Sequence, residues 1–257
     1  MTYVISLINY KGGCTKTSTT VGLGAALARK DKRVLLVDCD PQSHVAAHLG
    51  ISDYDIEIAL EDVLGTRGSN IDEIVLETRS SNLWIAPSTR NLLRARQDLA
   101  NRPKRDALLY RIIKPVLKEY DFVLIDTPPD EGLLTMNAMY ASEYLIIPTP
   151  LATFPLMGID VLNDSIEMIK EAYEERNLEI LGILVNEYDG RRTRQNNRNF
   201  EKLREAFGEK VFQTFIRTDE EIKEAQSHGK TIYEQAPGSK GAVDFMNLAD
   251  EVIQRLV

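Results

Sequence analysis

Residues 3–20, YVISLINYKGGCTKTSTT, run from an apolar stretch through a glycine pair into a helical pattern that begins near Lys16. A strand that enters a helix through such a loop directs backbone N–H groups at the loop, where the helix dipole also favours an anion. Gly12 and Gly13 lack a β-carbon, so the backbone can turn tightly and approach phosphate oxygens. The stretch therefore predicts a phosphate-binding loop.

The loop departs from the common pattern G-x-x-x-x-G-K-[ST], which requires glycine where this chain has Tyr10 and Thr15. In that pattern Lys16 would reach the β- and γ-phosphates, and the Thr17 hydroxyl would ligate Mg²⁺. Lys11 is an additional cation. Placed before the glycines, it points away from its own phosphates and could reach those of a neighbouring subunit; the alternative is a solvated surface lysine.

Composition limits the classes of protein to which the chain can belong. Its 257 residues, 43% of them hydrophobic and 27% charged, suit one globular α/β domain covering residues 1–257. The net charge of −8 means that any nucleic-acid binding must come from a local basic patch. Two cysteines, Cys14 and Cys39, are too few for a disulfide framework and are expected to be small, semi-buried side chains without a redox or metal role. No apolar run is long enough to span a membrane and no secretory signal is recognisable, so we expect a cytoplasmic location.

Short apolar runs alternate with helical patterns along the chain. The candidate strands are residues 3–9, 33–38, 82–87, 121–127, 143–149, 178–186 and, more weakly, 210–216. The candidate helices are residues 16–30, 89–100, 105–118, 132–141, 156–176, 197–207 and 241–256. Continuous apolar runs indicate strands that are covered on both faces. The sequence therefore predicts a three-layer α/β fold, with a mostly parallel twisted sheet flanked by helices.

Two further strands end in carboxylates. RVLLVDCDPQ, residues 33–42, carries two carboxylates, Asp38 and Asp40, at the end of its apolar run. DFVLIDTPP, residues 121–129, carries Asp126, at a position from which nucleotide hydrolases hold Mg²⁺ through a water. Ligands of parallel sheets bind beyond the carboxyl ends of the strands, where all these polar residues fall.

Taken together, these motifs resemble the ParA/MinD group of ATPases. KGGCTKT fits the group's deviant phosphate-loop pattern K-G-G-x-x-K-[ST], and VDCDPQSHVAAHLGI and DFVLIDTPPDEGLLTMNAMYASEYLIIPTP are similar to two further segments of the family. The similarity continues through GILVNEYDGR, FGEKVFQTFIR and SKGAVDFMNLADEV, so it covers nearly the whole chain. Within the group, the chain is most similar to Soj-like partition ATPases. The commonest family sequence has glycine at the position of Thr15, so the resemblance implies an intact loop of altered fine geometry.

The resemblance implies specific roles for the loop and the strand-end residues. In this family two subunits sandwich two ATP molecules, and Lys11 would neutralise phosphate charge in the partner's site. Asp40 would position the attacking water, while Asp38 and Asp126 would organise the surroundings of Mg²⁺ together with Thr17. The implied phosphate cradle is Gly12, Gly13, Cys14, Thr15, Lys16, Thr17 and Ser18. Asn186, at the end of its strand, resembles the family residue that contacts adenine.

Two of these residues allow another interpretation of their role. Asp38 could instead cap the segment that follows it. Asn186 precedes EYDG and could be an ordinary turn asparagine.

Residues 191–204, RRTRQNNRNFEKLR, carry six basic residues and one acidic residue in an otherwise acidic protein. A charge run of this kind is often only a solvated helix face. In the resembled family, however, nonspecific DNA binding uses basic residues in the C-terminal part of a dimer, and two-fold symmetry would double the patch. The candidate DNA-binding residues are Arg191, Arg192, Arg194, Arg198 and Lys202. Three acidic residues that follow Arg217 make a contribution from that residue doubtful.

The resemblance implies an ATPase that binds ATP and Mg²⁺ and forms a homodimer in the presence of ATP. It also implies that the dimer binds nonspecific DNA of the nucleoid and that a ParB-like centromere-binding adaptor stimulates its slow hydrolysis. The final helix, LADEVIQRLV, lacks the lysine-rich face of MinD-like members, so we expect no membrane attachment. Two alternatives remain: an ATPase of the same kind that positions a protein cargo, and a metabolic or electron-transfer relative. A relative of nitrogenase iron protein needs cysteines at a dimer axis, whereas Cys14 and Cys39 lie at the predicted nucleotide site. For a small-molecule ligase, no substrate pocket can be identified from the sequence.

Overall fold

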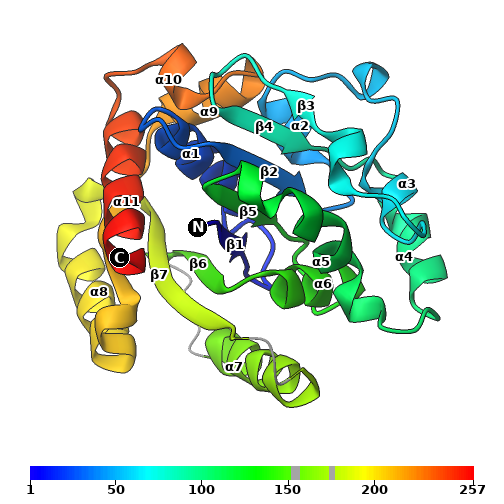
Figure 1. The fold of residues 1–257 in the computed structure, drawn as a ribbon. Coiled ribbons are helices and arrows are strands. Elements are labelled where there is room, and N and C mark those ends of the chain that lie inside the picture. The colour runs from blue at the N-terminus through cyan, green and yellow to red at the C-terminus, as the bar shows by residue number, and fades with distance from the viewer. Residues whose placement is uncertain (152–156, 174–176) are drawn as a thin grey trace.

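One eight-stranded sheet runs through the computed structural model, which describes residues 1–151, 157–173 and 177–257 (Figure 1). The side chains of residues 157–161, 192 and 193 also lie outside the description. The strands are β1 (Tyr3–Leu7), β2 (Val34–Asp38), β3 (Leu76–Glu77), β4 (Leu83–Ala86), β5 (Phe122–Asp126), β6 (Tyr144–Pro150), β7 (Glu179–Tyr188) and β8 (Val211–Arg217). Their order in the sheet is β3-β4-β2-β5-β1-β6-β7-β8, and every pairing is parallel except β3 with β4.

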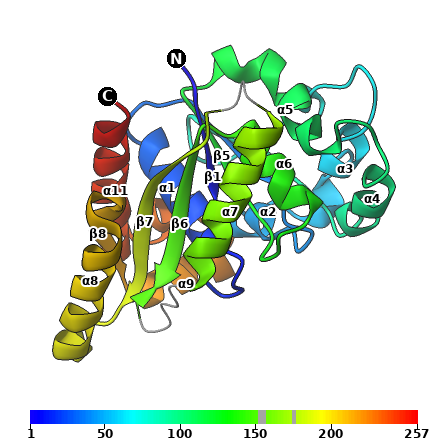
Figure 2. The same ribbon diagram turned by 90° about the horizontal axis from the view of Figure 1, so that it is seen from below.

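Helices cover both faces of this sheet. They are α1 (Lys16–Ala28), α2 (His44–His48), α3 (Leu60–Val63), α4 (Leu92–Leu99), α5 (Leu108–Ile113), α6 (Leu133–Ala141), α7 (Met157–Ala172), α8 (Thr193–Phe207), α9 (Glu220–Ser227), α10 (Ile232–Gln235) and α11 (Lys240–Leu256). Figure 1 shows α1 and α11 on one face and α5 and α6 on the other, and Figure 2 shows α7 in front of β6. The predicted three-layer, mostly parallel architecture is confirmed.

The burial of β2 on both faces of the sheet explains why its apolar run is continuous. Val34 and Leu36 belong to the hydrophobic cluster shared with α1 and α11, whereas Leu35 and Val37 belong to the cluster shared with α5 and α6. All four side chains are fully buried. Neighbouring side chains of a strand point to opposite faces, so a strand buried on both faces needs an apolar residue at every position.

Glycines allow α1 to pack closely beneath the phosphate loop. A β-carbon at Gly22 would lie 2.5 Å from the ring of Phe245 in α11, and one at Gly24 would lie 2.7 Å from Leu36 of β2. Neither neighbour could move without disturbing the core. Close packing fixes α1 against the sheet and so fixes the direction of its amino end.

The predicted helix at residues 105–118 is interrupted in the structure. Residues 105–107 and 114–119 form 3₁₀ turns, and only α5 between them is α-helical. Pro115 lies in the second of these turns, where its missing N–H cannot continue the α-helical ladder. Helix α7 lies within the predicted helix 156–176, of which residues 156 and 174–176 are outside the described residues.

Candidate nucleotide-binding site

The phosphate loop connects β1 to α1 and turns through left-handed backbone. Gly13 has a φ of 74°, and Thr15, the residue before α1, has φ 56° and ψ 27°. Left-handed conformation costs an ordinary residue about 1–2 kcal/mol and is rare for a β-branched one. No atom lies within 4 Å of a β-carbon added at Gly12 or Gly13. The loop is therefore an open cradle of backbone at a helix amino end, as anion binding requires.

Lys16 is buried in this cradle. Its side chain is 7% exposed, and its Nζ donates a hydrogen bond of 2.9 Å to the carbonyl oxygen of Asn9. Burial lowers the pKa of Lys16, while the neighbouring Asp126 acts against that shift. In the described part of the chain this carbonyl is the one hydrogen-bond acceptor of the ammonium, which can therefore be attracted strongly by an anion entering the loop.

Lys11 lies on the outer side of the same loop. It is exposed, and its backbone N–H donates to Oδ1 of Asn9 at 2.9 Å. Within the described part of the chain, its ammonium forms no ion pair. Cys14, between the two lysines, is buried and, like Cys39, is a free thiol, as expected.

Thr17 and Asp126 meet at the base of the cradle, although 109 residues separate them. The Thr17 hydroxyl donates to Oδ2 of Asp126 at 2.6 Å, and the Thr20 hydroxyl donates to Oδ1 at 3.3 Å. In the sheet Asp126 is paired in register with Asp38, so the ends of β2 and β5 bring two carboxyl groups together. Both are fully buried.

Burial raises the pKa of both carboxyl groups. For Asp126 the pKa rises to about 7, because the effect of burial exceeds the opposing effects of the Thr17 hydrogen bond and the Lys16 charge. For Asp38 the pKa lies well above the usual value, owing to burial and to the charge of Asp126. Such a pair favours a cation between or beside the carboxylates.

Asp38 and Asp40 have different local tasks. Asp38 accepts backbone hydrogen bonds from Asp40 and Val45 at 3.0 and 3.2 Å, so it does cap the following turn. Asp40 accepts from the backbone of Gln42 at 2.9 Å and is 9% exposed. Of the two, Asp40 is thus the less deeply buried carboxylate.

The carboxyl pair predicts how the stability of the nucleotide-free protein depends on pH. Asp126 loses its proton near pH 4 when unfolded and near pH 7 when folded, so between these values the folded state binds more protons. Stability therefore falls as pH rises through this window. We expect Asp126→Asn to flatten the decline and to raise the Tm at pH 7.5 by several degrees, measured by thermal unfolding from pH 5 to 8.

The matched control is Asp98→Asn, on an exposed position of α4, which should leave the pH dependence of the Tm as it is in the parent. An Asp126→Asn variant with the parental pH dependence would show that the buried carboxyl does not carry the effect.

Mg²⁺ fits this site only as part of a nucleotide complex. Among the described residues, no group of three or more histidine, cysteine, aspartate or glutamate side chains is arranged to hold a metal ion. Mg²⁺ usually takes one or two protein ligands and completes its shell with phosphate oxygens and water. The Thr17 hydroxyl, backed by Asp126 and Asp38, is a donor set of this kind.

A cavity of about 170 Å³ adjoins the cradle. Asn186, at the end of β7, lines it, and so do Ser18 of α1 and Gln226 of α9, whose Nε2 donates to the Ser18 hydroxyl at 2.6 Å. Asn186 is 2% exposed, and its Oδ1 has no hydrogen-bond partner among the residues that the structure describes. An orphaned buried acceptor at a cavity wall is consistent with a ligand that brings a donor, as a nucleobase would.

No local pattern predicts Gln226 at this site, because its helix is short and polar and begins more than two hundred residues after the loop. Arg217 also lines the cavity, but its guanidinium is engaged by Asp244 through contacts of 2.7–3.1 Å. The doubt about Arg217 as a DNA contact therefore gains a structural reason.

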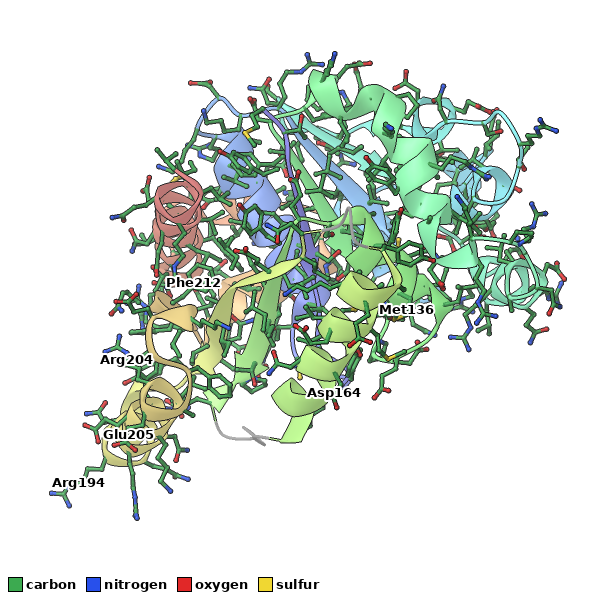
Figure 3. The ribbon with its side chains drawn as sticks, turned by 60° about the horizontal axis from the view of Figure 1, so that its bottom comes forward. Met136, Asp164, Arg194, Arg204, Glu205 and Phe212 are labelled. Carbon is green, nitrogen blue, oxygen red and sulfur yellow. The ribbon has the colours of Figure 1, made fainter. Side chains whose placement is uncertain are left out.

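The basic run forms most of α8, at the edge of the sheet beside β8 (Figure 2). Arg194, Arg198 and Lys202 are exposed and spaced four residues apart, so they share one helix face. Figure 3 shows Arg194 extending from the outer end of α8 away from the body of the molecule. The acidic residues Glu201 and Glu205 are exposed on that same face.

The two remaining candidates in the run differ from these three. Arg191 is exposed but forms an ion pair of 2.9 Å with Asp189. The side chain of Arg192 lies outside the described residues. Searching the described helices for a stretch of sufficient length and apolarity to cross a membrane finds none.

Comparison with known proteins places this geometry in context. The model of a family described as "AAA domain" matches residues 2–180. The chromosome-partitioning ATPase Soj of Thermus thermophilus is 38% identical over 98% of this chain and 96% of its own length.

Two solved structures are similar over nearly the whole chain. The cobyrinic acid a,c-diamide synthase of Mycobacterium smegmatis, solved with ADP and magnesium, has a TM-score of 0.85 at 27% identity, covering 100% of this chain and 96% of its own. The septum site-determining protein MinD of Pyrococcus horikoshii, solved with Mg-ADP, has a TM-score of 0.76 at 29% identity, covering 98% and 96%.

Proposed function

Because this chain belongs to the ParA/Soj-type partition ATPases of the ParA/MinD group, we propose that it is an ATP-switched DNA-partition motor. ATP binding joins two copies face to face, the dimer holds nonspecific DNA, and slow hydrolysis to ADP and phosphate releases it. The observation that carries this proposal is one loop with two lysines, Lys16 buried in the cradle and Lys11 exposed beside it.

Each residue of the cradle has a task in this proposal. Lys16 exchanges its bond to the Asn9 carbonyl for a phosphate oxygen, and the loop N–H groups hold the remaining phosphate charge. The Thr17 hydroxyl would hold Mg²⁺, which when bound would supply further positive charge for the phosphates. Lys11 has no phosphate of its own within the loop and reaches the nucleotide of the partner copy.

Hydrolysis depends on Asp40, which is less deeply buried than Asp38 and positions the attacking water. Phosphoryl transfer requires chiefly positioning and charge stabilisation, so a carboxylate and two lysines support a slow reaction. A slow intrinsic rate leaves room for stimulation by a ParB-like adaptor. In this proposal the protein is cytoplasmic and associates with the nucleoid through its DNA-bound dimer.

The DNA-binding surface is assigned to the exposed face of α8, chiefly Arg194, Arg198 and Lys202, with Arg191 and Arg192 at its start. A dimer would present this face twice, with up to about six phosphate contacts from the first three residues. Glu201 and Glu205 on the same face weaken the attraction, which suits a protein that must release DNA when its dimer separates.

We expect ATP with Mg²⁺, and not ADP, to produce dimers that bind duplex DNA of any sequence, measured by light scattering after gel filtration and by fluorescence anisotropy. Replacing Arg194, Arg198 and Lys202 by alanine should leave the dimer intact but lower the slope of log affinity against log salt by about 0.9 for each lost contact.

The matched control changes the net charge of the same helix face in the opposite direction. Glu201→Gln with Glu205→Gln removes two negative charges from each copy and should tighten DNA binding. DNA affinity that is equal with ATP, ADP and no nucleotide would count against the switch, and an unchanged salt slope in the alanine variant would remove α8 from the interface.

A small-molecule ligase is the second candidate, because the structure resembles the cobyrinic acid a,c-diamide synthase. The identity to that protein is 27%, against 38% to the partition ATPase Soj, so the partition function is preferred. A motor of the same design that positions a protein cargo would also dimerise with ATP, but its dimer would not bind DNA in the anisotropy measurement.

A further inference from the structure

The amide of Asn186 is clamped between two threonines of the phosphate loop and α1. Its Nδ2 donates to the hydroxyl of Thr15 and, at 2.9 Å, to the hydroxyl of Thr19. An asparagine amide has two N–H donors on one arm and a carbonyl acceptor on the other. Both donors are therefore used within the protein, and Asn186 Oδ1 points away from the two threonines.

The orientation of this amide is fixed because neither threonine hydroxyl has a hydrogen to offer it. Thr15 Oγ1 donates its own hydrogen to the carbonyl of Cys14 at 2.7 Å, and Thr19 Oγ1 donates to the carbonyl of Thr15, also at 2.7 Å. Each hydroxyl can then only accept from Asn186. Turning the amide over would place Oδ1 against two lone pairs or require both hydroxyls to abandon their carbonyls.

The clamp leaves Oδ1 of Asn186 as a buried acceptor to which the described residues offer no donor, on a side chain that lines the 170 Å³ cavity beside the phosphate loop. Adenine carries an amine donor at its six-position, where guanine carries a carbonyl acceptor. A fixed acceptor forms a hydrogen bond with the adenine amine and repels the guanine carbonyl. Because guanine would leave a buried polar group unpaired, the discrimination between the two bases is strong.

We propose that Thr15 is a positioning residue that sets the nucleobase preference of this site, because its hydroxyl holds Asn186 with Oδ1 presented to the six-amine of adenine. This inference rests on the proposed nucleotide function. It also accounts for a β-branched residue in left-handed backbone at φ 56°, where glycine would be free of strain: glycine has no hydroxyl to complete the clamp.

The test compares Thr15→Ala with Thr15→Ser, two variants of similar backbone cost that differ in the hydroxyl. Binding of ADP and of GDP to the full chain is measured by calorimetry, and the ratio of the two Kd values is the readout. We expect Thr15→Ala to reduce the preference for ADP on the order of tenfold, and Thr15→Ser to retain it. Thr19→Val, which keeps the side-chain shape but removes the second hydroxyl, should reduce it as well.

The ratio separates this inference from general damage to the loop, which would weaken ADP and GDP equally and leave the ratio unchanged. An unchanged ratio in both Thr15→Ala and Thr19→Val would overturn the inference while leaving the proposed function intact, and so would a parent protein that prefers GDP. A parent that binds neither nucleotide would refute the proposed function itself.

Discussion

Lys16→Ala is expected to weaken nucleotide binding sharply, with the Kd for ADP rising about ten- to a hundredfold. The ammonium is buried in the cradle, and the described residues give it one hydrogen-bond acceptor, the neutral Asn9 carbonyl, which a phosphate oxygen can replace. A charge-assisted hydrogen bond contributes about 1.5–3 kcal/mol, and about 1.4 kcal/mol corresponds to a factor of ten in affinity. Calorimetry with Mg²⁺ and ADP measures the change.

The fold should survive this substitution. Burial already disfavours the charged form of Lys16, as its lowered pKa indicates, so removing the ammonium relieves a desolvation cost. We expect a Tm at or above that of the parent. An alanine variant that still binds ADP with parental affinity would mean that the loop is not the phosphate cradle.

Lys11→Ala is the matched comparison, because it removes a second lysine from the same loop at an exposed position. ADP affinity should remain close to the parental value, whereas ATP should no longer produce a dimer in gel filtration. The two variants therefore assign nucleotide binding to Lys16 and dimerisation to Lys11.

The sequence was sufficient to predict the sheet, because burial on both faces leaves a continuous apolar run at every central strand. Strand β3, with two residues, is too short to give such a signal. The short helices α2, α3, α9 and α10 were not predicted either, since each offers barely one or two turns of periodicity. The apolar spacing of residues 105–118 predicts one continuous helix, but Pro115 cannot donate the hydrogen bond that would continue it.

The sequence predicts which residues form the candidate site, but it does not predict the contacts between them. Lys16, Thr17 and Asp126 carried recognisable spacing, yet the bond between Thr17 and Asp126 depends on the register of β5 against β1, which local patterns do not contain. The left-handed conformation of Thr15 was likewise hidden, because a β-branched residue argues against positive φ. The clamp on Asn186 follows from that conformation and could only be found in the structure.

Asp40→Asn should trap the ATP-bound dimer. The asparagine keeps a side-chain oxygen to accept from the backbone of Gln42, so the turn that follows β2 is preserved, while the negative charge that orients the water is lost. Base-assisted positioning contributes about 10²–10⁴-fold to such reactions, so we expect turnover to fall by at least about a hundredfold. Phosphate release measures this, and ADP affinity serves as the check on the fold.

A trapped ATP-bound dimer can be distinguished from a protein that has only lost its activity. If hydrolysis is the step that separates the dimer, the Asp40→Asn protein should remain dimeric and DNA-bound for as long as ATP is present, and a ParB-like adaptor should fail to release it. Asp40→Ala should behave in the same way, with some added loss of stability from the broken turn. Parental turnover in the asparagine variant would assign the water to another carboxylate; lost turnover without a persistent dimer would uncouple hydrolysis from the switch.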